Sequence, residues 1–455
     1  MYKIIYSKFI KDNFFREDNK NCDELDPIFL MAERFKKLPT TICESKETKH
    51  ICYHNSKYNN YNKIAKFKYG LICKMENIIL DPLKSFQTNY IYNGPIDKIH
   101  KGFPILKKGF LSMKCEVFGK DRISNKLYKT YFKSWKYEND ENEGKIPELA
   151  PGKIIFFVSR NQDSPNLFHG ISELINVICI MYLFNIDPQN IQIIFLESMN
   201  LKNDPLFYLY KKLVSKGGDP LYIRNLKQKY HISSAIYVPI NWDSPLFIKL
   251  NIPKGYPDCN YSTKTFNIFD NLINKYLKIP YFKDSFTSEG DIFYYPKSVI
   301  QNSLNNCFNI TITIQWRKVW PKNRKFQQRI LGNGPELADS LASALQKNYL
   351  IRLVDTASLS IIEQISIMKK TDYLIGVHGA GLSLSIFMPS HGVLYEILPK
   401  KKNNLLLILS SLSGHLSFSD IISSKMKIIN DNEIFFFDSK EFTTKALKII
   451  KKSHF

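Results

Sequence analysis

The 455-residue sequence lacks several features that would point to common protein classes. It contains no Cys-x-x-Cys pair, which argues against zinc ribbons and thioredoxin-like redox chemistry. It contains no Asp-x-Asp pair, so one frequent signature of a metal site is missing. Glycine is sparse, with 19 residues, and no sequence period repeats, which excludes collagen-like and repeat architectures. No apolar run reaches the roughly 18 residues that span a bilayer, and the nearest, 174–184, contains Asn176.

Arginine is also scarce, although the chain is strongly basic. Its 64 Lys and Arg residues outnumber 42 Asp and Glu residues, which gives a formal net charge of +22. Such a charge is typical of nucleic-acid-binding proteins, but here the excess is nearly all lysine, scattered among Asn, Ile and Tyr. Three of the nine arginines, Arg317, Arg324 and Arg329, fall in one short segment. Because arginine binds phosphate through a planar fork, this cluster predicts a local anion site, and we expect no nucleic acid as a partner.

The composition changes near residue 150. Five of the eight cysteines lie in the first 115 residues, and a polar run at 137–144 is typical of a linker. The skew of the cysteines suggests N-terminal disulfides, whereas free thiols in a reducing compartment remain the alternative. We expect an N-terminal extension at 1–150, a first α/β domain at 151–290 and a second α/β domain at 291–455.

The two later regions alternate short apolar strands with helices. In the first, strands at 153–159 and 191–197 flank a helix at 170–184; in the second, strands at 309–316 and 349–355 flank a helix at 335–348. Buried strands that alternate with helices indicate a parallel sheet covered on both faces. The predicted fold class is therefore α/β, with two Rossmann-like domains that face a cleft and bind ligands at the carboxyl ends of their strands.

The most informative motif begins at the end of a predicted strand. His378, Gly379, Ala380 and Gly381 lead from an apolar strand into a helical stretch. Glycines let the backbone approach a ligand closely, and a helix start offers N–H groups and a positive dipole end. A His-Gly-rich oxyanion hole of an esterase would need a Gly-x-Ser-x-Gly nucleophile motif, and the chain has none.

Two further segments carry charge at predicted strand ends. Arg317 follows a strand, and Arg329 and Asn333 precede a helix, so the arginines could neutralise a diphosphate; a solvated basic loop is the alternative. Glu396 ends the strand after the glycine loop, where a carboxylate could accept both hydroxyls of a ribose. A surface carboxylate would be the simpler explanation.

A last segment lies at the start of the first long helix. His169 and Glu173 are four residues apart, so both project from one helix face. A His–carboxylate pair could supply a general base or orient an acceptor hydroxyl, or His169 could only cap and pack. Asn166 precedes this pair in the same Asn-x-Phe-His block.

Together these segments resemble glycosyltransferase family 61, collinearly from about residue 150 to 420. The resemblance rests on the His-Gly-Ala-Gly-Leu block with Pro389 and Glu396, on the arginine block that ends at Leu337, and on the block at 166–173. The stretch at 51–81 is loosely similar to N-acetylglucosaminyltransferases of that family. Departures are Ser383, where Thr is common, and the Gly-Pro pair after Asn333.

The resemblance implies an inverting, GT-B-type enzyme that moves a sugar, GlcNAc or xylose, from a UDP-sugar to a protein or glycan hydroxyl. It implies His169 and Glu173 as catalytic residues. It implies that donor binding falls to Asn166, Arg317, Arg329, Asn333, His378, Gly379, Ala380, Gly381 and Glu396. No metal or other cofactor is expected. A non-catalytic lectin-like relative and a basic nucleic-acid-binding protein are the alternatives.

The resemblance also implies work in the lumen of the endoplasmic reticulum or Golgi, although no clear signal peptide or transmembrane segment is seen. From that setting and the skew of the cysteines, we predict at least one disulfide among Cys43, Cys52, Cys73 and Cys115.

Overall fold

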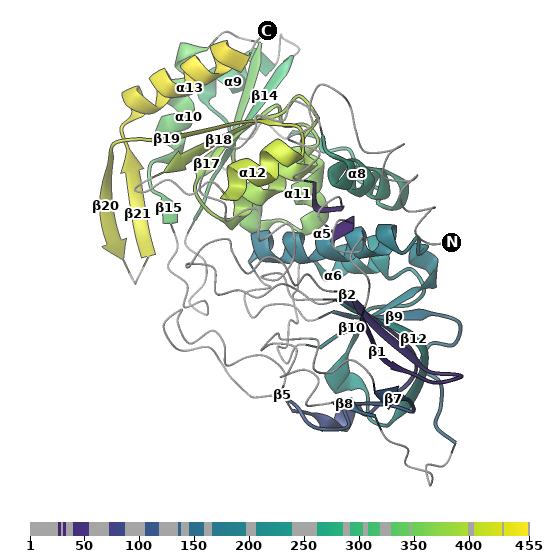
Figure 1. Cartoon of the computed structure of the whole chain (residues 1–455). Helices are drawn as coiled ribbons and strands as arrows, with labels where there is room; N and C mark the ends of the chain where they lie inside the picture. The colour runs from purple at the N-terminus through teal and green to yellow at the C-terminus, as the bar shows by residue number, and fades with distance from the viewer. Residues whose placement is uncertain are drawn as a thin grey trace. The chain divides into compact units, whose positions relative to one another are not determined.

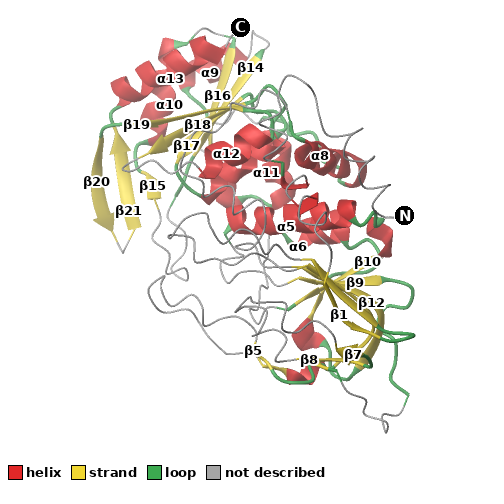
Figure 2. Cartoon of the chain, in the orientation of Figure 1, coloured by secondary structure: helices red, strands yellow, loops and turns green. Residues whose placement is uncertain are grey.

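The fold is known from a computed structural model, which describes most of the chain. The described residues are 26–28, 31–32, 40–53, 72–86, 105–117, 135–137, 145–158, 166–196, 206–238, 262–284, 292–303, 308–318, 329–345, 348–398, 405–429 and 432–453. Strands and helices alternate along much of this part (Figures 1 and 2), which confirms the α/β class. The described residues up to 238 form one compact unit, and those from 262 form a second.

The first unit is built on a mixed ten-stranded sheet in which β11-β10-β9-β12-β3-β2-β1-β7 is the main order and β6 and β8 lie off it. The strands are β1 (Thr40–Glu44), β2 (Lys49–Tyr53), β3 (Ile72–Leu80), β6 (Leu111–Met113), β7 (Glu116–Val117), β8 (Trp135–Lys136), β9 (Ile154–Val158), β10 (Ile191–Phe195), β11 (Leu221–Tyr222) and β12 (Tyr230–Val238). The strands from β9 to β12 pair in parallel, whereas β3 joins β12 antiparallel. The sheet therefore continues across the expected boundary at residue 150.

The parallel part of this sheet is covered by helices whose ends are set by the sequence. Helix α5 (Leu167–Leu183) starts where the side chain of Asn166 accepts a hydrogen bond of 3.1 Å from the N–H of Phe168. Almost every residue of the helix is buried, in agreement with its apolar sequence. Helix α6 (Phe207–Leu209) continues into a wider turn at Tyr210–Val214. A small pair, β4 (Ser85–Phe86) and β5 (Ile105–Leu106), completes the unit.

Two disulfides join strands of the first unit. Cys43 is bonded to Cys115, and Cys52 is bonded to Cys73, which confirms the prediction that this set contains a disulfide. In the chain-entropy model, a cross-link over loops of this size stabilises the fold by about 3–4 kcal/mol.

The second unit contains a six-stranded sheet in the order β13-β16-β14-β17-β18-β19 and a three-stranded sheet in the order β15-β21-β20. The strands are β13 (Phe293–Tyr294), β14 (Ile310–Gln315), β15 (Arg329–Leu331), β16 (Tyr349–Val354), β17 (Tyr373–Val377), β18 (Val393–Leu398), β19 (Leu416–Ile421), β20 (Ser424–Ile429) and β21 (Asn432–Phe437). In the larger sheet only β13 pairs antiparallel. Such a sheet brings the carboxyl ends of β14, β17 and β18 to one edge.

Helices cover both faces of the larger sheet (Figure 2). They are α8 (Lys264–Tyr276), α9 (Lys297–Ser303), α10 (Gly334–Ala344), α11 (Ile361–Met368), the 3₁₀ helix η10 (Ala380–Phe387), α12 (Leu405–Leu412) and α13 (Ser439–Ser453). Helices α10 and α13 share one core with the strands, and α11, η10 and α12 pack on the other side. None of the helices in the described part of the chain is both long and apolar enough to span a bilayer.

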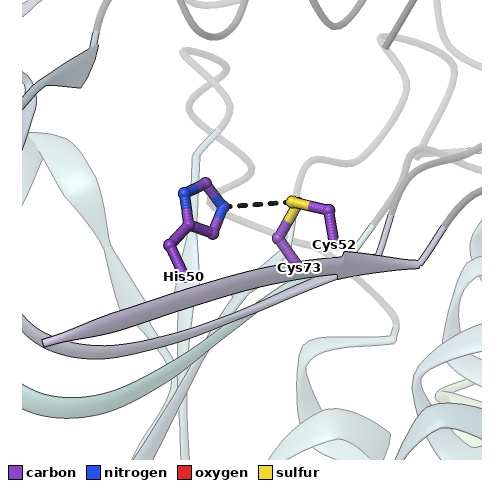
Figure 3. A group of neighbouring side chains, drawn as sticks. All are labelled: His50, Cys52 and Cys73. Atoms are coloured by element: carbon purple, nitrogen blue, oxygen red, sulfur yellow. Dashed lines mark hydrogen bonds between the residues drawn. A yellow bond between two sulfur atoms is a disulfide. The ribbon is translucent and has the colours of Figure 1, made fainter. Parts of the chain in front are cut away.

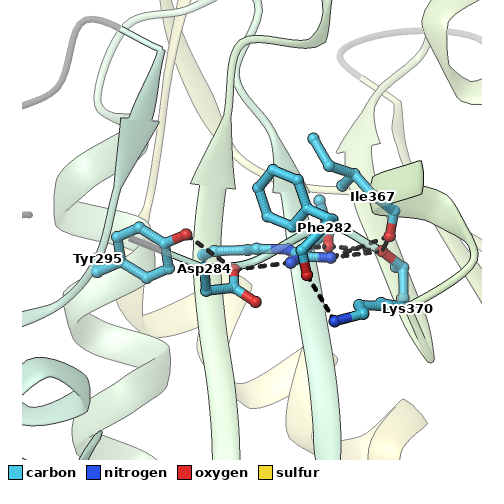
Figure 4. A network of polar contacts seen from close by, with 8 residues as sticks. Phe282, Asp284, Tyr295, Ile367 and Lys370 are labelled. Atoms are coloured by element: carbon cyan, nitrogen blue, oxygen red, sulfur yellow. Dashed lines mark hydrogen bonds and ion pairs between the residues drawn. The ribbon is translucent and has the colours of Figure 1, made fainter. Parts of the chain in front are cut away.

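A buried arginine ties the segment after α8 to the sheet of the second unit. Arg352, on β16, has a side chain with no exposed surface, and its Nη1 lies 2.8 Å from Oδ1 of Asp284. The other donors reach Thr313 Oγ1 (3.0 Å), the carbonyl of Ile367 (3.0 Å) and Thr371 Oγ1 (3.2 Å). The hydroxyl of Tyr295 donates to the same aspartate oxygen (Figure 4). A buried charge with this many partners is fully compensated.

We expect Arg352→Met to destabilise the second unit by about 3–5 kcal/mol, because the partly buried Asp284 carboxylate loses its cation. Calorimetric unfolding measures the loss. The matched control is Lys445→Met, which removes a partner of Glu441 in a 2.7 Å pair whose side chains are each 30% exposed, and such a pair is worth only about 0.2–1 kcal/mol. Equal losses in the two variants would contradict the argument.

Candidate functional site

The candidate site lies where two adjacent parallel strands of the second unit end. Strand β14 ends at Gln315 and is followed two residues later by Arg317, and β17 ends at Val377 and is followed by His378. The two strands pair directly, so their carboxyl ends lie at the same edge of the sheet. The N–H of His378 still donates to the carbonyl of Ile397, at 2.9 Å, so this residue is held in place by β18.

Two arginines converge on one main-chain oxygen at this edge. Nη1 of Arg317 donates to the carbonyl of His378 at 3.0 Å, and Nη1 of Arg329 donates to the same oxygen at 3.2 Å. The N–H of Leu331 donates to the carbonyl of Arg317 at 3.1 Å, which ties the two arginine segments together. The two arginine side chains therefore lie side by side, and their role in anion binding stays a prediction.

The positive charge of this pair is poorly compensated. Within the described ranges, no carboxylate lies within ion-pair distance of either guanidinium. Burial, and then the charge of Arg329, lower the pKa of Arg317 to about 10, which leaves it protonated at neutral pH. Two cations that share one neutral carbonyl favour a negatively charged ligand beside them. The arrangement is able to bind a diphosphate or another compact anion.

A buried carboxylate supports the same loop from the other side. Oε1 of Glu396, on β18, pairs with Nδ1 of His378. The side chain of Glu396 has no exposed surface, whereas that of His378 is 17% exposed. Oε2 of Glu396 is also buried and has no hydrogen-bond partner among the described residues. The strand continues to Leu398, so Glu396 lies inside β18 rather than at its end.

The glycines of the motif leave room for side chains from β14 and its following turn. A Cβ on Gly379 would lie 1.8 Å from Nη1 of Arg317, and a Cβ on Gly381 would lie 2.1 Å from Nε2 of Gln315. Ala380 begins the helix η10, and its carbonyl accepts a hydrogen bond of 2.6 Å from the hydroxyl of Ser383. The absence of side chains at the two glycines thus allows the arginine and the glutamine to occupy their positions.

Gln315 is a further residue at this edge, to which the sequence patterns assigned no role. It is buried at the end of β14, its Nε2 donates to Thr356 Oγ1 at 2.8 Å, and its Oε1 has no partner among the described residues. A glutamine at the end of a strand that alternates Ile and Thr was the available signal. Gln315 supports the loop by filling the space that Gly381 leaves.

Asn333 has a structural partner instead of an open side chain. Its Nδ2 donates to the carbonyl of Phe437 at 2.8 Å, and its Oδ1 accepts from the N–H of Phe437 at 3.0 Å. The residue therefore fixes the end of β21 beside the start of α10. Its role in donor binding stays a prediction.

The remaining predicted residues lie in the first unit. Asn166 caps α5, and the ring of His169 contacts Phe168 edge-on, with ring centroids 5.3 Å apart. His169 is half-buried and Glu173 is only 3% exposed. Both lie in the first two turns of one helix, as the spacing predicts, but their catalytic role stays a prediction.

Comparison with known proteins agrees with the motifs. The family model Glycosyltransferase 61 matches residues 222–395, a range that holds both arginines and the glycine loop. A segment of 103 residues is 31% identical to the EGF domain-specific O-linked N-acetylglucosamine transferase of Mus musculus. That segment covers 21% of this chain and 20% of the mouse protein.

Both matches are to glycosyltransferases, and the chain spans about a fifth of the length of the curated relative it matches. Residues 222–395 are thus similar to family 61 glycosyltransferases, as the arginine block and the glycine-loop block indicated. The family match ends at residue 395 and begins at residue 222. Glu396 and the block at 166–173 therefore lie outside the matched range.

We expect Gly379→Ala to weaken binding of inorganic pyrophosphate by roughly 10-fold or more, because the added Cβ displaces the Arg317 guanidinium, and a charge-assisted hydrogen bond is worth about 1.5–3 kcal/mol. Isothermal titration of the two proteins measures the change. The control is Ser298→Ala, which changes an exposed residue of α9. Unchanged affinity in Gly379→Ala would show that Arg317 does not bind the anion.

Proposed function

We propose that this protein transfers a sugar from a UDP-sugar to a hydroxyl of a protein or glycan, with inversion at the anomeric carbon. The observation that carries the proposal is the pair of arginines on the carbonyl of His378, inside the family 61 match. A nucleoside diphosphate is the leaving group of such a reaction, and it gains negative charge in the transition state. The likeness to an N-acetylglucosamine transferase supports GlcNAc as the sugar, with xylose second.

The donor roles are proposed for residues of the second unit. In this proposal, Arg317 and Arg329 hold the diphosphate, and the backbone N–H groups of 379–381 add hydrogen bonds to it. Oε2 of Glu396 is a buried acceptor with no partner among the described residues, and such an atom needs a donor. A ribose hydroxyl is the donor that we propose. The arginines replace the charge of a metal ion, so no cofactor is required.

The acceptor side is proposed for the first unit. His169 would act as the general base for the acceptor hydroxyl, and Glu173, one turn further along α5, would orient it. The two α/β units would then be the two domains of a GT-B enzyme. A setting in the endoplasmic reticulum or Golgi lumen is also part of the proposal, and the two disulfides support it because disulfides persist in oxidising compartments.

A thermal-shift screen against UDP, UDP-GlcNAc, UDP-xylose and other nucleotide-sugars tests the donor. A ligand at 100 times its Kd stabilises the native state by about 2.7 kcal/mol, so a true donor raises the melting temperature. Transfer to candidate acceptors is then assayed with and without EDTA. Loss of transfer in EDTA that Mn²⁺ restores would overturn the metal-free donor site, and a chain that binds no nucleotide would overturn the function.

We expect Arg329→Ala to weaken UDP by roughly 10- to 100-fold, because one charge-assisted contact of about 1.5–3 kcal/mol is lost. Transfer should slow further, since the leaving-group charge grows in the transition state. Arg317→Lys should retain little of the UDP affinity, because the point charge of lysine cannot replace the planar fork of arginine. Calorimetric titration with UDP checks both variants. Wild-type affinity in both would place the donor pocket elsewhere.

Glu396→Gln should weaken the binding of UDP and leave the binding of inorganic pyrophosphate unchanged, because pyrophosphate has no ribose. The same titrations, run with both ligands, separate the two effects. An equal loss for both ligands would mean that Glu396 acts only by holding His378 and the loop beside the arginines.

His169→Ala and Glu173→Gln should lower turnover and leave UDP affinity nearly unchanged, because general-base catalysis contributes about 10²–10⁴-fold and no donor binding. Steady-state rates and UDP titrations of each variant are the measurements. Normal rates in both variants would make this helix face purely structural, and weaker UDP binding would move it to the donor side.

A further inference from the structure

A second cluster of reactive side chains lies in the first unit and includes the disulfide between Cys52 and Cys73. His50 and Cys52 are two apart on β2, so they share one face of the strand. Cys73 on β3 lies directly opposite Cys52 in the antiparallel register. Nε2 of His50 is 3.1 Å from Sγ of Cys52, and the ligand atoms of all three residues lie within 4.8 Å of one another (Figure 3).

The surroundings of His50 suit a metal ligand. The residue is completely buried, and burial lowers its pKa to about 3, so the ring is neutral at physiological pH. Nδ1 lies 3.5 Å from the hydroxyl of Tyr137, and the ring packs on Trp135 with centroids 4.9 Å apart. The tautomer with its proton on Nδ1 would direct the lone pair of Nε2 toward a metal ion bound at the sulfur. Metal-bound histidines commonly have such an outer partner.

The sheet holds the three residues in place without help from the disulfide. Strand β2 pairs with β3 from Lys49 opposite Glu76 to Tyr53 opposite Ile72. Strand β3 is also paired with β12 on its other side, from Cys73 to Leu80. Breaking the bond between Cys52 and Cys73 therefore leaves both backbones fixed, with two thiols and an imidazole still on one face.

We propose that His50, Cys52 and Cys73 form a redox-gated binding site for a thiophilic d¹⁰ cation, of which Zn²⁺ is the representative. In the oxidised protein the disulfide occupies the site. A thiol reductant supplies two electrons and two protons: two R–SH become R–S–S–R, and the protein disulfide becomes two thiols. Zn²⁺ then binds both sulfurs and Nε2, and the two thiol protons are released to solvent.

The dimensions fit such a change. With bonds of about 2.3 Å to sulfur and about 2.0 Å to nitrogen, ligand atoms around a tetrahedral zinc ion lie roughly 3.3–3.8 Å apart. Once the disulfide is reduced, the two sulfurs therefore need to move apart by less than the distance between neighbouring strands. Met75 lies opposite His50 in the register and is fully buried, so its thioether is the candidate for the fourth ligand. Soft sulfur donors favour Zn²⁺ and Cu⁺ over Mg²⁺ or Ca²⁺.

The test is zinc binding by the full chain before and after reduction. Anaerobic treatment with a water-soluble phosphine, which leaves as its oxide, reduces the disulfides; a chromophoric chelator then reports Zn²⁺ by competition. We expect one equivalent bound by the reduced protein and none by the oxidised protein. His50→Ala should weaken binding by at least 10–100-fold, since loss of an outer partner alone costs about that much.

The control removes the neighbouring disulfide. A Cys43→Ser, Cys115→Ser protein keeps the proposed ligands and should still bind one equivalent after reduction. A Cys52→Ser, Cys73→Ser protein should bind none at this affinity. Equal binding by oxidised and reduced protein, or binding that survives both His50→Ala and the Cys52–Cys73 change, overturns the proposal. Loss of the far-ultraviolet circular dichroism of the first unit on reduction also overturns it, because the sheet must hold the ligands.

Discussion

Two positive charges held against one main-chain oxygen form the constraint on which the candidate site depends. Arg317 and Arg329 both donate to the carbonyl of His378, and at roughly 5 Å two unit charges repel by on the order of 3 kcal/mol at an effective dielectric of about 20. The fold tolerates this repulsion because the strands fix the oxygen and Gly379 leaves room for the guanidinium. An anion between the arginines would turn the repulsion into attraction.

Comparison with Arg352 shows that the scarcity of arginine in the sequence does not by itself identify an anion-binding residue. Arg352 is also one of the few arginines of the chain, and its side chain is more buried than those of Arg317 and Arg329. Its partners are the carboxylate of Asp284 and three further oxygen acceptors. Its positive charge is therefore neutralised within the protein. Arg317 and Arg329 have no carboxylate among the described residues, so their charge remains available to a ligand. A carboxylate partner distinguishes a structural arginine from one that can bind an anion, and the sequence does not reveal such partners.

Much of the second unit could be predicted because its strands and helices are encoded by short, contiguous stretches of sequence. Apolar runs with β-branched residues became β14, β16, β17 and β18, and parallel pairing places their carboxyl ends together. The partner of Glu396 could not be predicted, because the pairing of its side chain with His378 depends on β17 and β18 being neighbours in a fixed register. The partner of Asn333 could not be predicted for the same reason, since Phe437 is 104 residues away.

The first unit was harder to predict because its sheet is assembled from distant segments. Strand β3 pairs with β12 across more than 150 residues, so the cysteine-containing region joins the α/β sheet instead of preceding it. A disulfide within the set Cys43, Cys52, Cys73 and Cys115 could be anticipated from the cysteine skew and the family resemblance. The pairing of Cys52 with Cys73, with His50 on the same face, required the register. Composition thus predicted the chemistry of single segments, whereas long-range pairing decided which residues meet. Both clusters discussed for this protein arise from such pairing: one at the ends of parallel strands, the other between antiparallel neighbours.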